Sequence, residues 1–77
     1  MTEVELDCRG QVCPMPVIAL AKAVRDLEVG DTVVLLADDP AAAADIPAWC
    51  RMKQQEFLGA DTTADGTPRF RVRRTGH

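Results

Sequence analysis

The spacing of apolar residues changes from a strand period to a helix period within the first third of the chain. Val4 and Leu6 alternate with acidic residues, which predicts a half-buried strand over residues 3–7. A loop follows over residues 8–12. From Pro14 to about Leu27 the apolar positions recur at helical spacing, which predicts an amphipathic helix. The apolar positions of this helix are Val17, Leu20, Ala21, Val24 and Leu27.

A second strand and a second helix are expected in the middle of the chain. The run from Thr32 to Ala37 is almost entirely apolar and rich in β-branched residues, which is typical of a central strand. The Asp38-Asp39-Pro40 segment ends it. Because Pro47 is tolerated only in a first helical turn, the next helix is predicted to begin close to Asp45, after a turn over residues 41–44.

Five residues of the predicted second helix share one face, and a hairpin is expected after it. The face comprises Ile46, Trp49, Cys50, Lys53 and Phe57. Gly59 is the expected C-terminal stop of this helix. A short strand near Thr62-Thr63, the turn signal Asp65-Gly66 and a last strand from Arg69 to Arg74 complete the chain.

These elements predict the order βαβαββ within one domain, residues 1–77. Right-handed crossovers place both helices on one face of a four-stranded mixed sheet, so the expected fold is an α/β two-layer sandwich of the α+β type. A chain of 77 residues buries only about 60% of its unfolded surface, which predicts a small core and chemistry at an exposed loop or helix end.

Charge and composition narrow the functional classes. The net charge of −3 disfavours a dedicated nucleic-acid-binding domain, because such domains are normally strongly basic. No apolar run approaches the roughly 20 residues of a membrane span. The acidic start of the chain lacks the features of a signal peptide, and the cysteine count of three is odd. We therefore expect a cytoplasmic protein with reduced thiols.

Cys13 is the strongest candidate for chemistry. It precedes Pro14, and a residue before proline is disfavoured in a helix, so Cys13 is expected to cap the first helix with Pro14 at the first helical position. The positive end of the helix dipole favours a thiolate there. Pro14 and Pro16 supply no N–H, which leaves the amides of Met15 and Val17 for the sulfur. Arg9 adds positive charge if its loop folds back. The alternative is that Cys13 only fills a small space.

The other cysteines have weaker cases. Cys8 lies at the end of the first strand and is expected to be a small apolar residue, although a second thiol that resolves an oxidised Cys13 stays open. Cys50 is expected in the core. No paired cysteine spacing supports a metal site, and the one histidine, His77, is terminal. We therefore expect neither a metal nor a bound cofactor.

The last strand carries alternating arginines. Arg69, Arg71 and Arg73 are predicted to share its solvent face, with Arg74 beside them. A charged strand face that prevents aggregation is one interpretation. A docking patch for an acidic partner or for tRNA backbone is the other.

The segment Leu6-Asp7-Cys8-Arg9-Gly10-Gln11-Val12-Cys13-Pro14-Met15-Pro16 resembles the TusA/SirA family of small sulfur-carrier proteins. The resemblance extends over nearly the whole chain and includes the Gly30-Asp31 turn and the Ala37-Asp38-Asp39-Pro40 segment. It implies a fold like the C-terminal domain of translation initiation factor three. It also implies that Cys13 is the reactive residue, within a motif in which Arg9, Gly10, Pro14 and Pro16 give support.

The resemblance further implies that Cys13 takes sulfane sulfur from a cysteine desulfurase or another, rhodanese-like, sulfurtransferase and holds it as a persulfide. A protein acceptor then receives it, for tRNA thiolation, cofactor synthesis or sulfur metabolism. Such a chain is a monomeric carrier rather than a self-sufficient enzyme, and tRNA is at most an indirect partner. Two other functions remain open from the residues: a thiol–disulfide switch using Cys8 and Cys13, and an RNA-binding regulatory module using the arginine strand.

Overall fold

The computed structural model describes residues 2–12 and 14–76 and has the element order βαβαββ, which confirms the predicted order. Cys13 lies outside the described residues. The elements are β1 (Glu3–Asp7), α1 (Met15–Asp26), β2 (Thr32–Leu36), α2 (Ala42–Lys53), β3 (Glu56–Thr62) and β4 (Pro68–Arg73).

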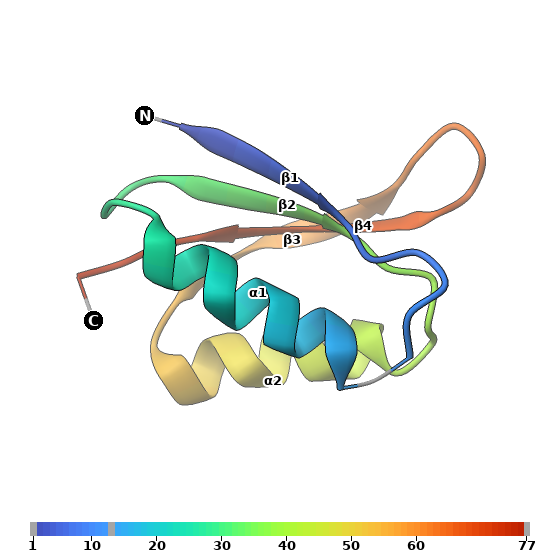
Figure 1. Ribbon diagram of the computed structural model, residues 1–77, viewed down its shortest axis with the longest axis horizontal. Coiled ribbons are helices and arrows are strands. Elements are labelled where there is room, and N and C mark those ends of the chain that lie inside the picture. Colours follow the sequence, from blue (N-terminus) through green and yellow to red (C-terminus); the bar gives the residue numbers. More distant parts are fainter. Residues whose placement is uncertain (1, 13, 77) are drawn as a thin grey trace.

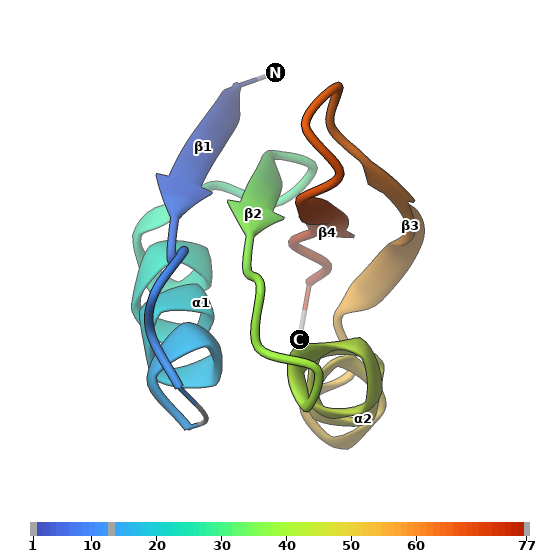
Figure 2. The same ribbon diagram turned by 90° about the vertical axis from the view of Figure 1, so that its right-hand side faces the viewer.

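The four strands form one mixed sheet with the order β1-β2-β4-β3. β1 and β2 are parallel, and β4 is antiparallel to both of its neighbours, β2 and β3. Both helices cover the same face of the sheet (Figure 1). Seen along the strands, α1 lies under β1 and β2, and α2 lies under β4 and β3 (Figure 2). The predicted two-layer sandwich is therefore confirmed.

The core lies between the sheet and the two helices. Leu35 of β2, Leu20 of α1 and Ile46 of α2 are completely buried. The central strand is apolar on both faces, because Val34 and Leu36 on the open face of the sheet are also buried. Their neighbours across the strands are charged residues of β1 and β4, whose long side chains can cover them.

The first helix begins one residue later than predicted. Pro14 occupies the N-cap position rather than the first helical position. Its carbonyl accepts the N–H of Ile18 at 3.0 Å, and Val12 accepts the N–H of Met15 at 2.9 Å. The Met15 amide, expected to be available to the sulfur, is thus already bonded to backbone. Pro16 is buried within the first turn, where a missing N–H costs nothing.

The prediction for the start of α2 was wrong. The helix begins at Ala42, so Pro47 lies inside it rather than in its first turn. Two bonds start the helix early: Asp39 accepts the N–H of Ala41 through its carboxylate and that of Ala42 through its carbonyl, both at 3.0 Å. Alanine has the highest helix propensity, so residues 41–44 continue readily into the helix. Proline costs about 3 kcal/mol in a helix interior, and burial of its neighbour Ile46 offsets part of this cost.

The end of α2 and the start of β3 were also predicted wrongly. The helix ends at Lys53, which is exposed, because Gln54 adopts the left-handed conformation with φ of 57°. The Gln55 N–H then donates to the Cys50 carbonyl at 2.9 Å, which closes the end of the helix. Phe57 accordingly lies in β3 and packs against the core from the sheet.

The third strand is longer than the short strand expected near Thr62-Thr63, since it already begins at Glu56. Gly59 does not stop a helix. It lies at a register shift between Phe57 and Gly59, opposite β4, with φ of 138°, a conformation that glycine adopts without strain. The predicted Asp65-Gly66 turn is confirmed: Gly66 has φ of 87°, and its N–H donates to the Thr63 carbonyl.

No helix within residues 2–12 and 14–76 has the length and apolar character needed to cross a bilayer.

Stability should depend on the buried face of α1 and not on its exposed face. We expect Leu20→Ala to lower the free energy of unfolding by about 2–5 kcal/mol, because it leaves a cavity among fully buried side chains. Ile18→Ala is the matched control on the same helix: Ile18 is 41% exposed, so its truncation should cost less than about 1 kcal/mol. Urea denaturation followed by circular dichroism measures both. Equal losses would contradict this packing.

Candidate functional site

The loop that precedes α1 is fastened to the loop that precedes α2. The Cys8 N–H donates to the Leu36 carbonyl at 2.8 Å, and the Gly10 N–H donates to the Asp38 carboxylate at 3.0 Å. Gly10 has φ of 81°, and a Cβ atom at this position would have no other atom within 4 Å. Glycine is therefore favoured there by its backbone conformation and not by lack of space. The two loops run side by side at one end of the molecule (Figure 1). Asp38 thus helps to fix the chain that leads to Cys13.

The residues on both sides of Cys13 are at the surface. Val12 is 68% exposed and Met15 is 48% exposed, and Pro14 between them is also exposed. Cys13 itself lies outside the described residues. The described residues on either side of position 13 are therefore accessible to another protein.

The side chain of Arg9 is bound to carboxylates. Its guanidinium donates to Asp7 at 2.9 Å and 2.7 Å in a bidentate arrangement, and it lies 3.7 Å from Asp65 of the β3–β4 turn. These hydrogen bonds hold the pKa of Asp7 at about 2, well below its ordinary value. Arg9 connects the loop to the β3–β4 turn. Because these two carboxylates largely balance its positive charge, Arg9 contributes less to stabilising a thiolate at Cys13 than the sequence suggested.

The two described cysteines are both buried and both reduced. Cys8 is 3% exposed, and burial, with a smaller contribution from the charge of Asp7, raises the pKa of its thiol. Burial raises the pKa of Cys50 to about 11. Both side chains belong to the hydrophobic core. Among the described residues there is also no group of three acidic, cysteine or histidine side chains that could hold a metal ion.

Three of the four C-terminal arginines form ion pairs on the open face of the sheet. Arg69 lies 2.6 Å from Asp61, Arg71 lies 3.3 Å from the same carboxylate, and Arg73 lies 2.5 Å from Glu56. Arg69 also lowers the pKa of Asp61 to about 2. The strand therefore presents a mixed-charge surface, which favours the interpretation of an aggregation-resistant sheet face over that of an RNA-binding patch.

Arg74 was expected beside the solvent-facing arginines of the last strand, but its side chain contacts the end of α1 instead. Its Nη1 donates to the carbonyls of Val24, Arg25 and Leu27 at the end of α1. These carbonyls lie at the C-terminal end of the helix, where the negative end of its dipole is, so a guanidinium stabilises them; the Val24 carbonyl also accepts the Leu27 N–H. This placement could have been predicted from the alternation of side chains along the last strand, because position 74 lies on the face opposite Arg73.

An apolar groove adjoins the start of α1. It has a volume of about 280 Å³. Its walls are formed by Pro14, Val17, Asp45, Ala48, Trp49 and Met52. Met52 is 69% exposed at its edge, so apolar side chains from both helices are accessible beside Pro14. The sequence placed Trp49 only on one face of the predicted second helix and did not reveal this groove, because the groove depends on how α1 and α2 pack together.

Two comparisons with known proteins, one with protein families and one with solved structures, found similar proteins. A family described as Sulfurtransferase TusA matches residues 4–74. A SirA-like protein from Desulfitobacterium hafniense has a similar solved structure, with a TM-score of 0.80 and 25% sequence identity. The similarity covers 97% of this chain and 99% of that protein. The resemblance stated from the motif is thus supported independently by a family match and by the fold.

The three thiols should differ sharply in reactivity. At pH 8 we expect iodoacetamide to modify the native protein once, at Cys13, because burial keeps the Cys8 and Cys50 thiols protonated and inaccessible. Peptide mapping by mass spectrometry identifies the modified residue. In urea, all three cysteines should react. Modification of native Cys8 or Cys50 at a rate comparable to that of Cys13 would contradict this ranking.

The carboxylate of Asp38 should restrain the loop before Cys13. In Asp38→Ala we expect amide hydrogen exchange at Gly10 to become about five- to tenfold faster, since one hydrogen bond of about 1–1.5 kcal/mol is lost. NMR-detected exchange measures this rate. Asp26→Ala, which removes an exposed carboxylate at the end of α1, is the control and should leave Gly10 unchanged.

Proposed function

We infer the function of this chain from its family: it belongs to the sulfurtransferase TusA family, so its general role is sulfur transfer as a carrier. We propose that Cys13 is the residue that carries the sulfur, as a persulfide. The observation that carries this proposal is the position of the Cys13-Pro14-Met15-Pro16 motif at the start of α1, inside the matched region. Donor and acceptor are other proteins, and tRNA takes part at most indirectly.

The proposed reaction is a transfer between thiols without net oxidation. The Cys13 thiolate attacks the terminal sulfur of a donor persulfide on a cysteine desulfurase or another sulfurtransferase. A sulfur–sulfur bond forms at Cys13 while the donor's sulfur–sulfur bond breaks, and the donor leaves as a thiolate. The acceptor receives the sulfur in the next step, for tRNA thiolation, cofactor synthesis or sulfur metabolism. Exchange of this kind depends on thiolate formation and on access.

Three features of the described residues support this mechanism. The neighbours Val12 and Met15 are exposed, so a partner's active site can approach this part of the chain. The helix N-terminus favours both a thiolate and an anionic persulfide. The buried Pro16 and the hydrogen bond from the Gly10 N–H to Asp38 restrain the backbone after and before Cys13. A carrier that acts as a monomer in the cytoplasm is part of the same proposal.

The two other functions receive less support. A disulfide switch needs Cys8 to leave the core, because that side chain is 3% exposed. An RNA-binding module needs arginines with uncompensated charge, whereas Arg69, Arg71 and Arg73 each lie in an ion pair. Sulfur transfer through Cys13 requires neither rearrangement.

Sulfur loading tests the proposal directly. After incubation with a cysteine desulfurase, pyridoxal phosphate and cysteine, we expect intact mass spectrometry to show the addition of one sulfur atom, which dithiothreitol then removes. Cys13→Ser should abolish the addition, since no other thiol is accessible. Cys8→Ala and Cys50→Ala are the matched controls and should load to the wild-type level if they remain folded.

Two results would contradict the carrier function. One is equal loading of wild type and Cys13→Ser. The other is a Cys8→Ala protein that folds normally and yet fails to load, because the disulfide switch, and not the carrier, predicts a need for Cys8.

A further inference from the structure

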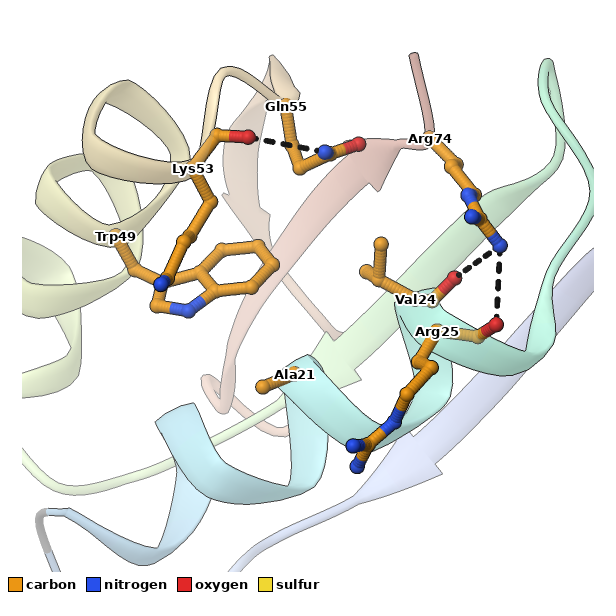
Figure 3. Close-up of a pocket in the computed structure, with 7 residues that line it drawn as sticks. All are labelled: Ala21, Val24, Arg25, Trp49, Lys53, Gln55 and Arg74. Atoms are coloured by element: carbon orange, nitrogen blue, oxygen red, sulfur yellow. Dashed lines mark hydrogen bonds between the residues drawn. The ribbon is translucent and has the colours of Figure 1, made fainter. Parts of the chain in front are cut away.

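A second and larger pocket lies between the two helices, away from the start of α1. It has a volume of about 380 Å³. Its walls are formed by Ala21, Val24, Arg25, Trp49, Lys53, Gln55 and Arg74. Figure 3 shows the indole of Trp49 with the side chains of Lys53, Arg25 and Arg74 around this pocket. Three cationic side chains thus gather here, on a chain whose net charge is −3.

The two pockets are neighbours along the seam between the two helices and are together called the interhelical groove. Both are lined by residues of α1 and α2, which lie next to each other under the sheet (Figure 2). Trp49 lines both pockets. Pro14 belongs to the first and Arg25 to the second, so the groove follows α1 over about 16 Å, at about 1.5 Å per helical residue.

The groove differs chemically between its ends. The end at Pro14 is lined mainly by apolar residues and holds one acid, Asp45. The far end holds Arg25, Lys53 and Arg74. Arg74 is held in place by its bonds to the carbonyls at the end of α1, so this cation is fixed before any ligand arrives. An occupant that carries its negative charge at the far end is therefore favoured over one in the opposite orientation.

We propose that this interhelical groove binds an extended segment of a protein partner, with apolar side chains next to Cys13 and a carboxylate between Arg25, Lys53 and Arg74. A span of about 16 Å corresponds to about five extended residues, at about 3.3 Å per residue. The proposal rests on the proposed function, because it makes the groove the surface by which a sulfur donor or acceptor is held while Cys13 reacts.

A protein segment fits the groove better than a small anion does. The cationic end alone would suit a free carboxylate or phosphate, but it adjoins, at Trp49, an apolar end that a small anion would leave empty. Met52, which lines the apolar end, is 69% exposed and presents its side chain to an occupant. Methionine is well suited to such surfaces because its flexible side chain adapts to different partners.

Selection from a random peptide display library tests the proposal without a named partner. We expect peptides enriched on the wild-type protein to combine apolar residues with Asp or Glu at a separation of about three to five positions. Synthetic copies without tryptophan are then titrated against the protein. Trp49 is the only tryptophan of the chain and lines both pockets, so its fluorescence reports occupancy.

Charge reversal in the groove supplies the decisive comparison. The double variant Arg25→Glu, Lys53→Glu should weaken binding of the acidic peptide by at least about tenfold and should bind a Lys-substituted copy better than the wild type does. The matched control is Lys22→Glu, Arg51→Glu, which makes the same charge change on the same helices outside both pockets. It should bind like the wild type.

The apolar end is tested separately. Met52→Ser removes an exposed apolar side chain at the groove and should weaken binding several-fold without unfolding the protein. No enrichment of acidic residues, or equal loss of binding in both double variants, would overturn the proposal. So would binding of free acetate or phosphate in place of the peptide.

Sulfur loading separates this inference from the proposed function. If Cys13 loads normally but the groove variants bind the acidic peptide unchanged, the groove assignment alone is wrong. If the peptides behave as expected but Cys13→Ser loads like the wild type, the groove binds a segment of this kind and the carrier function is wrong.

Discussion

The packing of both helices against one face of the sheet is the interaction on which the rest of this structure depends. Leu20, Leu35 and Ile46 meet there with no exposed surface, one each from α1, β2 and α2. A chain of this length has apolar residues for one such core and no second layer of helices. The outer sides of the helices, the seam between them and the loops at the ends of the strands therefore remain accessible, and the candidate site is built from these parts.

The same constraint explains which elements the sequence could predict. Residues 3–7, 14–27 and 32–37 each follow one period clearly, and each became the expected element, apart from shifts of one residue at its ends. Phe57 fitted two patterns, since it continues the apolar stripe of α2 and also suits a strand. Gln54 adopts the left-handed conformation and ends the helix, so Phe57 lies in the strand. A left-handed conformation at a residue other than glycine is rarely predictable from a single sequence.

Pro47 shows a general rule that failed for a local reason. Proline normally occurs in the first turn of a helix. Here the helix begins before Pro47, because Asp39 accepts the N–H groups of Ala41 and Ala42. The buried Ile46 and Trp49 hold the later turns of the helix against the core. Contacts that join distant parts of the chain could not be predicted at all. Asp38 reaches Gly10 across 28 positions and Arg74 reaches Val24 across 50, and neither pair has a signature in a single sequence.

The three cysteines illustrate how a fold can direct reactivity to one of several identical groups. A thiol reacts as its thiolate, so burial of Cys8 and Cys50 suppresses both access and ionisation, and the raised pKa values follow from the same loss of water. Cys13 lies in a segment with exposed neighbours, in front of a helix whose dipole favours an anion. Because the helix dipole is worth less than one pKa unit for a surface group, we expect a difference between the three thiols to come more from suppression of two than from activation of one. Selectivity among the thiols of such a chain would thus come from the core as much as from the exposed loop.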